Sequence, residues 1–244
     1  MSISNDFRNK VNKMNRASQN IKLGTIVQNL LSVLPSLDGA TGQSASSIYL
    51  TAGSATFGSG ADYSSFASDG TLTFSGSATI WEDLRFSLMQ GKQGQTDQPA
   101  FSTTEVGYLY PSSDATQIIY IIGQFPHSMK MGSDIHPHIH WKQTQSGSPV
   151  FKMDYKWFNL GGAVPANFST YVMSNRIVPF TSGSFHQLST GSALISGSDI
   201  NTVSSMILMK IYRDDNAYTG TAVAYELDIH YLSDGLGSNT EFVK

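Results

Sequence analysis

Hydrophobic and polar residues alternate in short runs along most of the chain from residue 48 onwards. The runs are rich in Ile, Val, Thr, Tyr and Phe, and clusters of Gly, Ser, Asn and Asp separate them, which is the pattern of strands joined by turns. We predict strands at 48–52, 71–74, 78–81, 84–88, 117–125, 135–142, 150–158, 169–177, 203–212 and 222–231. This set predicts an all-β fold, a two-sheet β-sandwich of jelly-roll type over 48–244.

The first 47 residues follow a different pattern. Apolar residues recur there at helical spacing until Pro35, which predicts a short helical N-terminal arm at 1–35. A polar run, SLDGATGQSASS at 36–47, predicts a flexible connector. The apolar face of the arm is a candidate partner-binding surface, either for a groove on another protein or for the sandwich and sister arms, and it consists of Leu23, Val27, Leu30, Leu31 and Leu34.

The composition limits the classes of partner. Charged residues make up only 14% of the chain, against roughly 25% in typical soluble domains, so Ser, Thr, Asn, Gln and Gly must cover the surface. A net charge of −3 gives no basic footprint, so we expect no nucleic-acid partner. The absence of cysteine excludes disulfides and Cys-ligated zinc. No apolar run is long enough for a bilayer, and the start lacks the features of a signal peptide, so we expect no membrane partner.

Three histidines alternate with apolar residues in DIHPHIHW at 134–141, and DIHY at 228–231 repeats the arrangement. Side chains alternate between the two faces of a strand, so the histidines of each string share one face and the apolar residues share the other. If the two strands are neighbours, four imidazoles and one carboxylate gather in a small area. These candidate metal ligands are His136, His138, His140, His230 and Asp228.

Two interpretations of these histidines remain open. His-x-His on a strand suits zinc, iron or nickel, and the GxxxxxHIH string that begins at Gly132 matches the opening of the first cupin motif. However, Thr144 and Gln145 stand where that motif has a Glu, and we find no second cupin motif. The alternative is a polar sheet face on which the histidines hydrogen-bond one another, Asp228 or a neighbouring subunit. We therefore predict no cofactor, with a divalent metal as the alternative.

Other strings give weaker signals. The Asp-Asp-Asn order at 214–216 fits either calcium or a plain turn. Glu82 and Asp83 are adjacent, so on a strand they point to opposite faces and cannot form a glycosidase pair. No nucleophile elbow, Walker loop or dinucleotide fingerprint occurs, so we predict no catalytic residues. Aromatic residues can pack in the core or offer a platform for sugars, and they are Tyr108, Tyr110, Tyr155, Trp157, Phe158 and Tyr171.

Several ordered strings resemble a family of tailed-bacteriophage and prophage virion proteins. They are DGTLTF at 69–74, GSATIWEDLR at 76–85, PH at 126–127, GSDIHPHIHW at 132–141, DIHY at 228–231 and LGSNTEFVK at 236–244. The resemblance implies a sandwich-type capsid decoration, head-fibre, collar or tail-associated protein, which is non-enzymatic, homotrimeric and located on the virion. It gives no catalytic residues, and it does not extend to residues 1–46.

The sequence thus predicts a phage virion structural protein that attaches through its N-terminal arm to a capsid, collar or tail protein. The first alternative is an adhesin module that binds host surface glycans. The second alternative is a cupin-like metal-dependent enzyme.

Overall fold

The computed structural model describes residues 55–244, except for 68, 95, 112–113, 144, 180–184, 216, 239 and 242. All of these residues belong to one compact unit, Leu50–Lys244. The predicted arm at 1–35, with its face of Leu23, Val27, Leu30, Leu31 and Leu34, lies outside the described residues, and so do the connector at 36–47 and the predicted strand at 48–52. Among the described residues, no helix is long and apolar enough to span a membrane.

The described part consists of strands and two short 3-10 helices, η1 (Gly76–Ala78) and η2 (Leu88–Gln90). The strands are β1 (Ala55–Ser59), β2 (Asp62–Phe66), β3 (Leu72–Ser75), β4 (Ile80–Ser87), β5 (Lys92–Gln93), β6 (Ala100–Ser102), β7 (Gly107–Tyr110), β8 (Asp114–Gln124), β9 (Ile135–Gln143), β10 (Phe151–Phe158), β11 (Ser169–Met173), β12 (Asn175–Arg176), β13 (Phe185–Thr190), β14 (Met206–Arg213) and β15 (Ala222–Ser233).

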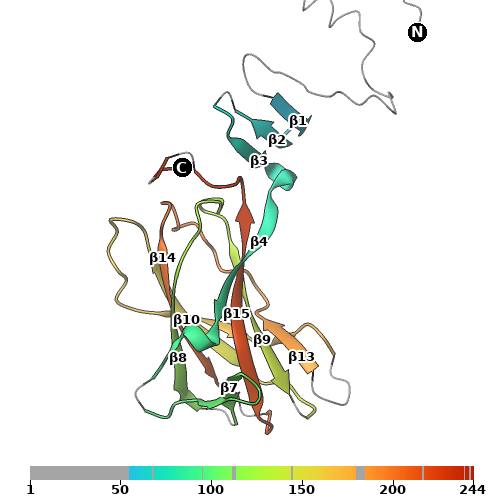
Figure 1. Ribbon diagram of the computed structural model, residues 1–244, viewed down its shortest axis with the longest axis vertical. Coiled ribbons are helices and arrows are strands. Elements are labelled where there is room, and N and C mark those ends of the chain that lie inside the picture. The colour runs from blue at the N-terminus through green and yellow to red at the C-terminus, as the bar shows by residue number, and fades with distance from the viewer. Residues whose placement is uncertain are drawn as a thin grey trace, which may run out of the picture. The chain divides into compact units, whose positions relative to one another are not determined.

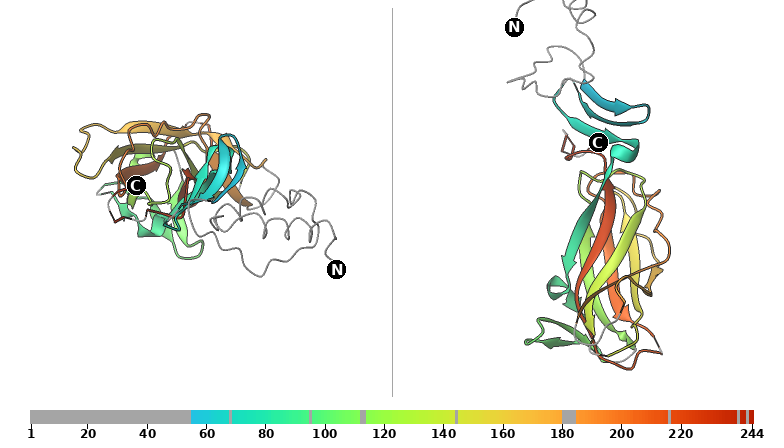
Figure 2. Two further views of the ribbon diagram at one scale, coloured as in Figure 1. Left: turned by 90° about the horizontal axis from the view of Figure 1, so that it is seen from above. Right: turned by 90° about the vertical axis from the view of Figure 1, so that its right-hand side faces the viewer.

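Eight of these strands form the two sheets of a jelly roll (Figure 1). The chain pairs β4 with β15, β8 with β14, β9 with β13 and β10 with β11, always antiparallel. It therefore resembles one long antiparallel hairpin that has been rolled up, which brings β15 between β4 and β9 and β14 between β8 and β10. The strands run side by side along a common direction (Figure 2). This order confirms the predicted all-β, jelly-roll sandwich.

The core lies between the two sheets and is made by every second residue of the central strands. On β9, Ile135, Ile139 and Trp141 are fully buried, and they pack in the same cluster as Ile207 and Ile211 of the opposing strand β14. Burying each such side chain contributes roughly 1.5–3 kcal/mol to folding. Because side chains alternate along a strand, the residues between them face away from the core. The histidines of β9 occupy these outward positions.

The predicted strands match the long strands of the structure. The predictions fail where charged residues interrupt the apolar pattern and where the chain passes from one sheet to the other. The predicted strands at 78–81 and 84–88 are a single strand, β4. Glu82 and Asp83 do not interrupt it, because Tyr231 donates a hydrogen bond to Glu82 (2.7 Å) on one face and His230 Nε2 lies 2.8 Å from Asp83 on the other. The predicted strand at 169–177 is two strands in different sheets, β11 and β12. Strands β1, β2, β5, β6, β7 and β13 were not predicted.

The Ser- and Gly-rich stretch before β4 forms a three-stranded antiparallel sheet of β1, β2 and β3. Asp69 and Gly70 form the turn between β2 and β3, where Gly70 has a φ of 86° and Asp69 Oδ1 accepts a hydrogen bond from the Thr71 N–H (2.9 Å). The Phe74 N–H donates to the carbonyl of Asp234, just beyond β15 (2.8 Å). This sheet is thereby tied to the end of β15.

The turn after β14 is organised by a buried ion pair. The Arg213 side chain is fully buried and donates Nε to Asp215 Oδ2 (2.6 Å) and Nη2 to Asp215 Oδ1 (3.2 Å). Asp214 accepts a hydrogen bond from Lys152 Nζ (2.5 Å), and Asn216 lies outside the described residues. Both carboxylates are thus paired with cationic side chains, which favours the plain turn over the calcium site.

Candidate functional site

Five of the six histidines lie on the outward face of the sheet formed by β13, β9, β15 and β4. The alternation predicted for β9 is present, and β15 runs antiparallel beside it. In that register Asp228 lies opposite His138, and His230 lies opposite His136. The sequence predicted which residues share a face, and the pairing of β9 with β15 brings the two groups together.

Three side chains converge at the centre of this face. The Nε2 atoms of His138 and His140 are 3.1 Å apart, and Asp228 Oδ2 lies 3.1 Å from His140 Nε2 and 3.4 Å from His138 Nε2. The side chains of His138 and Asp228 are each 5% exposed, and that of His140 is 21% exposed. We call these three residues the His–Asp cluster. Each offers one possible metal-ligand atom, and these atoms all lie within 4.8 Å of one another.

The other two predicted ligands have different partners on the same face. His136 Nε2 is 2.6 Å from the Thr190 hydroxyl on β13, and His230 Nε2 is 2.8 Å from Asp83 on β4. The His230 ring also packs against the His138 ring, with centroids 4.3 Å apart. These two histidines therefore flank the His–Asp cluster but do not point a nitrogen at Asp228.

His186 belongs to the site and was not singled out from the sequence. Its Nε2 lies 2.5 Å from His140 Nδ1, and the two rings stack with centroids 4.7 Å apart. His186 lies on β13, which pairs with β9. It is a single histidine in a polar segment with no predicted strand, so its position relative to β9 had no sequence signal.

A depression of about 420 Å³ opens beside the His–Asp cluster, and a pair of opposite charges forms part of its wall. Arg85 on β4 binds Glu226 on β15 through two hydrogen bonds of 2.5 and 3.1 Å. His140 and Asp228 line the same depression, so two members of the cluster are reached from solvent.

The surroundings set the charges of the cluster. Burial raises the pKa of the Asp228 carboxyl, but hydrogen bonds from His138 and His140 outweigh it and hold this pKa well below its usual range. Burial, together with the neighbouring His140 ring, lowers the pKa of His186. Burial and the neighbouring His138 ring lower the pKa of His230. The Asp228 carboxyl is therefore ionised, which is the form that binds metal ions, and the surroundings favour the neutral forms of His186 and His230.

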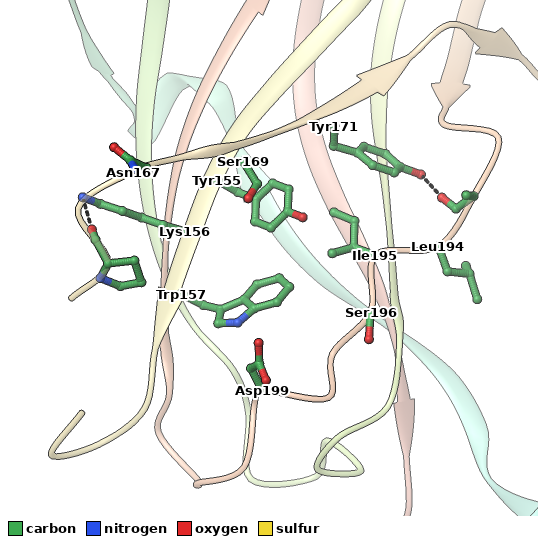
Figure 3. Close-up of a pocket in the computed structure, with 12 residues that line it drawn as sticks. Tyr155, Lys156, Trp157, Asn167, Ser169, Tyr171, Leu194, Ile195, Ser196 and Asp199 are labelled. Carbon is green, nitrogen blue, oxygen red and sulfur yellow. Dashed lines mark hydrogen bonds between the residues drawn. The ribbon is translucent and has the colours of Figure 1, made fainter. Parts of the chain in front are cut away.

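A second candidate site is a pocket of about 500 Å³ between β10, β11 and the segment before β14 (Figure 3). Three of the six aromatic residues considered for sugar binding line it, namely Tyr155, Trp157 and Tyr171. The rings of Tyr155 and Trp157 lie 5.1 Å apart at 31°. Asn167 and Asp199 add an amide and a carboxylate to the lining. Aromatic faces and hydrogen-bonding groups therefore meet in this pocket.

The remaining aromatic residues have other positions. Tyr108 and Tyr110 are buried in the core cluster, and Phe158 is half-buried at the end of β10. Of the two interpretations of these aromatic residues, packing in the core therefore holds for Tyr108 and Tyr110, and a shared surface is left to Tyr155, Trp157 and Tyr171.

Comparison with protein-family models finds no match for this sequence. Comparison with curated proteins finds none either.

Similar solved structures have low TM-scores. The insecticidal delta-endotoxin Cry8Ea1 from Bacillus thuringiensis has a TM-score of 0.35 and 14% identity, over 63% of this chain and 24% of that chain. A chain of infectious bursal disease virus, Gx strain, has a TM-score of 0.31 and 8% identity, over 75% of this chain and 47% of that chain. The enzymatically active domain of bacteriophage CBA120 tailspike protein 4 has a TM-score of 0.25 and 8% identity, over 64% of this chain and 19% of that chain. The similar structures thus include viral and phage proteins, and this chain spans less than half the length of each of these three.

Proposed function

We propose that this chain is a non-enzymatic structural protein of a phage particle, as a capsid decoration, head-fibre, collar or tail-associated component. In this proposal the sandwich is displayed on the particle, and the segment at 1–35 attaches it. The arm contacts another virion protein through its apolar face, as an amphipathic helix in a groove.

One observation carries the proposal. Three strings that carry the resemblance to phage virion proteins, at 76–85, 132–141 and 228–231, are far apart in the sequence. They contribute to β4, β9 and β15, and β15 pairs with both of the others. The resemblance therefore concerns one continuous part of one sheet rather than unrelated segments.

Deletion of residues 1–35 tests the attachment. We expect the truncated protein to fold, because the sandwich has its own core, and to be missing from purified particles. The measurement is immunoblotting of particles assembled in cells that express either form. Normal incorporation of the truncated protein would contradict the proposed attachment.

Point variants distinguish the apolar face from the rest of the arm. Val27→Asp and Leu31→Asp change the proposed contact surface, and we expect each to reduce incorporation strongly. Gln28→Asp adds the same charge at a position outside that surface and is the matched control, so it should leave incorporation unchanged.

The proposed assembly is a homotrimer, as the resemblance implies. Light scattering on the purified full chain should give about three times the chain mass of 26.5 kDa. A monomer at all concentrations would contradict the trimer but not the attachment.

The aromatic pocket favours a second candidate function, the binding of host surface glycans. The pocket volume of about 500 Å³ lies within the range of small-molecule sites, about 300–1,000 Å³. Tyr155 and Trp157 offer ring faces to the apolar side of a sugar, and Asp199 offers acceptors to its hydroxyls.

A glycan array with the full chain tests this candidate. Trp157→Ala should abolish binding, whereas Trp81→Ala is the control, because Trp81 is 51% exposed on β4 and does not line the pocket. Asp199→Ala should also weaken binding without removing an aromatic ring. Equal binding by wild type and both pocket variants would exclude this pocket as the glycan site.

A further inference from the structure

We infer that His138, His140 and Asp228 bind one divalent first-row transition metal ion, with His186 as a positioning residue. The ligand atoms are the Nε2 atoms of the two histidines and a carboxylate oxygen of Asp228. This inference goes beyond the proposed virion role and does not depend on it.

The distances between the three atoms fit a tetrahedral ion. Zn²⁺ binds His nitrogen at about 2.0–2.1 Å and carboxylate oxygen at about 2.0–2.2 Å, which places neighbouring ligand atoms of a tetrahedron about 3.3–3.5 Å apart. In the His–Asp cluster the three separations are 3.1, 3.1 and 3.4 Å. An ion therefore fits above the three atoms after shifts of only a few tenths of an ångström.

The hydrogen-bond partners of Asp228 support the binding of a cation. Both histidines contact the same oxygen, Oδ2, while Oδ1 is buried and has no hydrogen-bond partner. Buried carboxylate oxygens in proteins are nearly always hydrogen-bonded or bound to a metal. A face built only as a hydrogen-bond network would give Oδ1 a donor. An ion on Oδ2 balances the charge of the carboxylate directly, and a water molecule on that ion can donate a hydrogen bond to Oδ1.

His186 holds the ring of His140 in the orientation that the metal needs. A metal-bound histidine donates its second ring N–H to a fixed acceptor, which also sets its tautomer. His140 Nδ1 lies 2.5 Å from His186 Nε2, and the stacked rings limit rotation. With the proton on Nδ1 donated to His186, Nε2 of His140 has its lone pair available for the ion.

The ligand set selects the class of metal. Two imidazoles with one carboxylate suit Zn²⁺, Fe²⁺ and similar ions, whereas Ca²⁺ and Mg²⁺ prefer oxygen ligands throughout. Glu226 also lines the depression but is paired with Arg85 through both carboxylate oxygens, so it stays outside the ligand set. Three protein ligands leave one position of a tetrahedral ion for water or a bound molecule, reached through the depression.

Equilibrium dialysis with Zn²⁺ tests the site. The full chain, without a histidine tag and after removal of metal by a chelator, should bind one Zn²⁺ per chain. Asp228→Asn and His140→Asn should each weaken binding at least a hundredfold. His136→Gln is the matched control from the same strand and face, because His136 is bonded to Thr190, and it should bind as the wild type does.

His186→Gln tests the positioning role separately. Loss of a residue that orients a ligand typically weakens binding by about 10–100-fold, so this variant should still bind one Zn²⁺, but more weakly. The visible spectrum of the Co²⁺-loaded protein is the second readout: wild type should show the bands of four-coordinate Co²⁺, and His186→Gln should shift them. An unchanged affinity and spectrum would refute the positioning role.

The site itself is refuted by any of three results. These are no Zn²⁺ binding by wild type, full binding by Asp228→Asn, or equal losses in His136→Gln and Asp228→Asn. Circular dichroism of each metal-free variant verifies its fold. If Asp228→Asn does not fold, His140→Asn decides the question by the same measurement.

Discussion

Two aspartates, Asp215 after β14 and Asp228 on β15, are buried to similar degrees, with 7% and 4% of their surface exposed. Both carboxylates meet nitrogen donors, but in different arrangements. At Asp215 each oxygen accepts one bond from Arg213, and the backbone N–H groups of Tyr218 (3.0 Å) and Val150 (3.2 Å) also donate to it. At Asp228 one oxygen meets two imidazoles and the other meets no donor.

This difference separates a structural carboxylate from one that is available to a ligand. A buried ion pair whose hydrogen bonds are all made stabilises one geometry, and removing one member leaves an uncompensated charge. A buried carboxylate with an open oxygen, beside two imidazoles and a depression, has capacity for a cation. Variants at the two carboxylates, at a buried amide and beside an exposed carboxylate test this distinction.

The largest effect is expected for Arg213→Ala. This change leaves Asp215 buried without its cation, and breaking a buried pair costs about 3–5 kcal/mol of the free energy of unfolding. Urea unfolding of wild type and variant measures it. Lys152→Ala is the control, because Lys152 and Asp214 form a partly exposed pair that should contribute less than about 1 kcal/mol. Similar losses in both variants would remove the distinction between the two ion pairs.

The next effect is the stabilisation of the folded protein by Zn²⁺. Free Zn²⁺ at a hundred times its Kd should raise the free energy of unfolding by about 2.7 kcal/mol through binding to the native state alone. Thermal unfolding with and without the ion measures the increase. Asp228→Asn should show none of it, and Asp215→Asn, which does not alter the His–Asp cluster, should keep it.

A smaller effect is expected at Gln187, a buried side chain with no hydrogen-bond partner for its amide. Gln187 lies opposite Trp141 and therefore faces the core rather than the depression. Gln187→Met should increase the free energy of unfolding by about 1 kcal/mol, since it removes an unpaired buried polar group. A decrease would show that the amide has a partner in the folded protein, such as a buried water molecule. A buried polar atom without a protein partner would then be insufficient evidence for a binding site.

The smallest effect concerns an exposed carboxylate, Asp62. Hydrogen bonds from Ser77 lower its pKa, so they stabilise the ionised form in the folded protein. This contribution is complete above the ordinary Asp pKa of about 3.9, and it disappears as the pH falls through the lowered value. Carboxyl NMR titration should give a midpoint below that of a model peptide, and Ser77→Pro, which has no N–H, should restore the ordinary value.

The sequence was sufficient where the alternation of side chains along a strand decides which face of the sheet a residue occupies. Alternation placed His136, His138 and His140 opposite the core residues of β9, and it separated Glu82 from Asp83 on β4. It was insufficient where a partner comes from a distant strand. His186 reaches His140 only because β13 pairs with β9, and Arg213 was not recognised because its partner lies in the turn that was considered for calcium. Sheet order determines the contact of His186 with His140, whereas the Arg213–Asp215 pair is local and was missed because the turn was considered only as a source of calcium ligands.

The rolled-hairpin topology has a consequence for synthesis on the ribosome. Among the described strands β15 is the last to be made, yet it lies between β4 and β9. Until it is added, β4 lacks its partner in that sheet and β9 has one unpaired edge, and such edges promote aggregation. The contacts of β15 are also distant in sequence, which slows folding. The sheet, and the His–Asp cluster on it, is therefore completed only after β15 has been translated. Chains that stop before Ala222 have unpaired strand edges, and we expect proteases and chaperones to remove them.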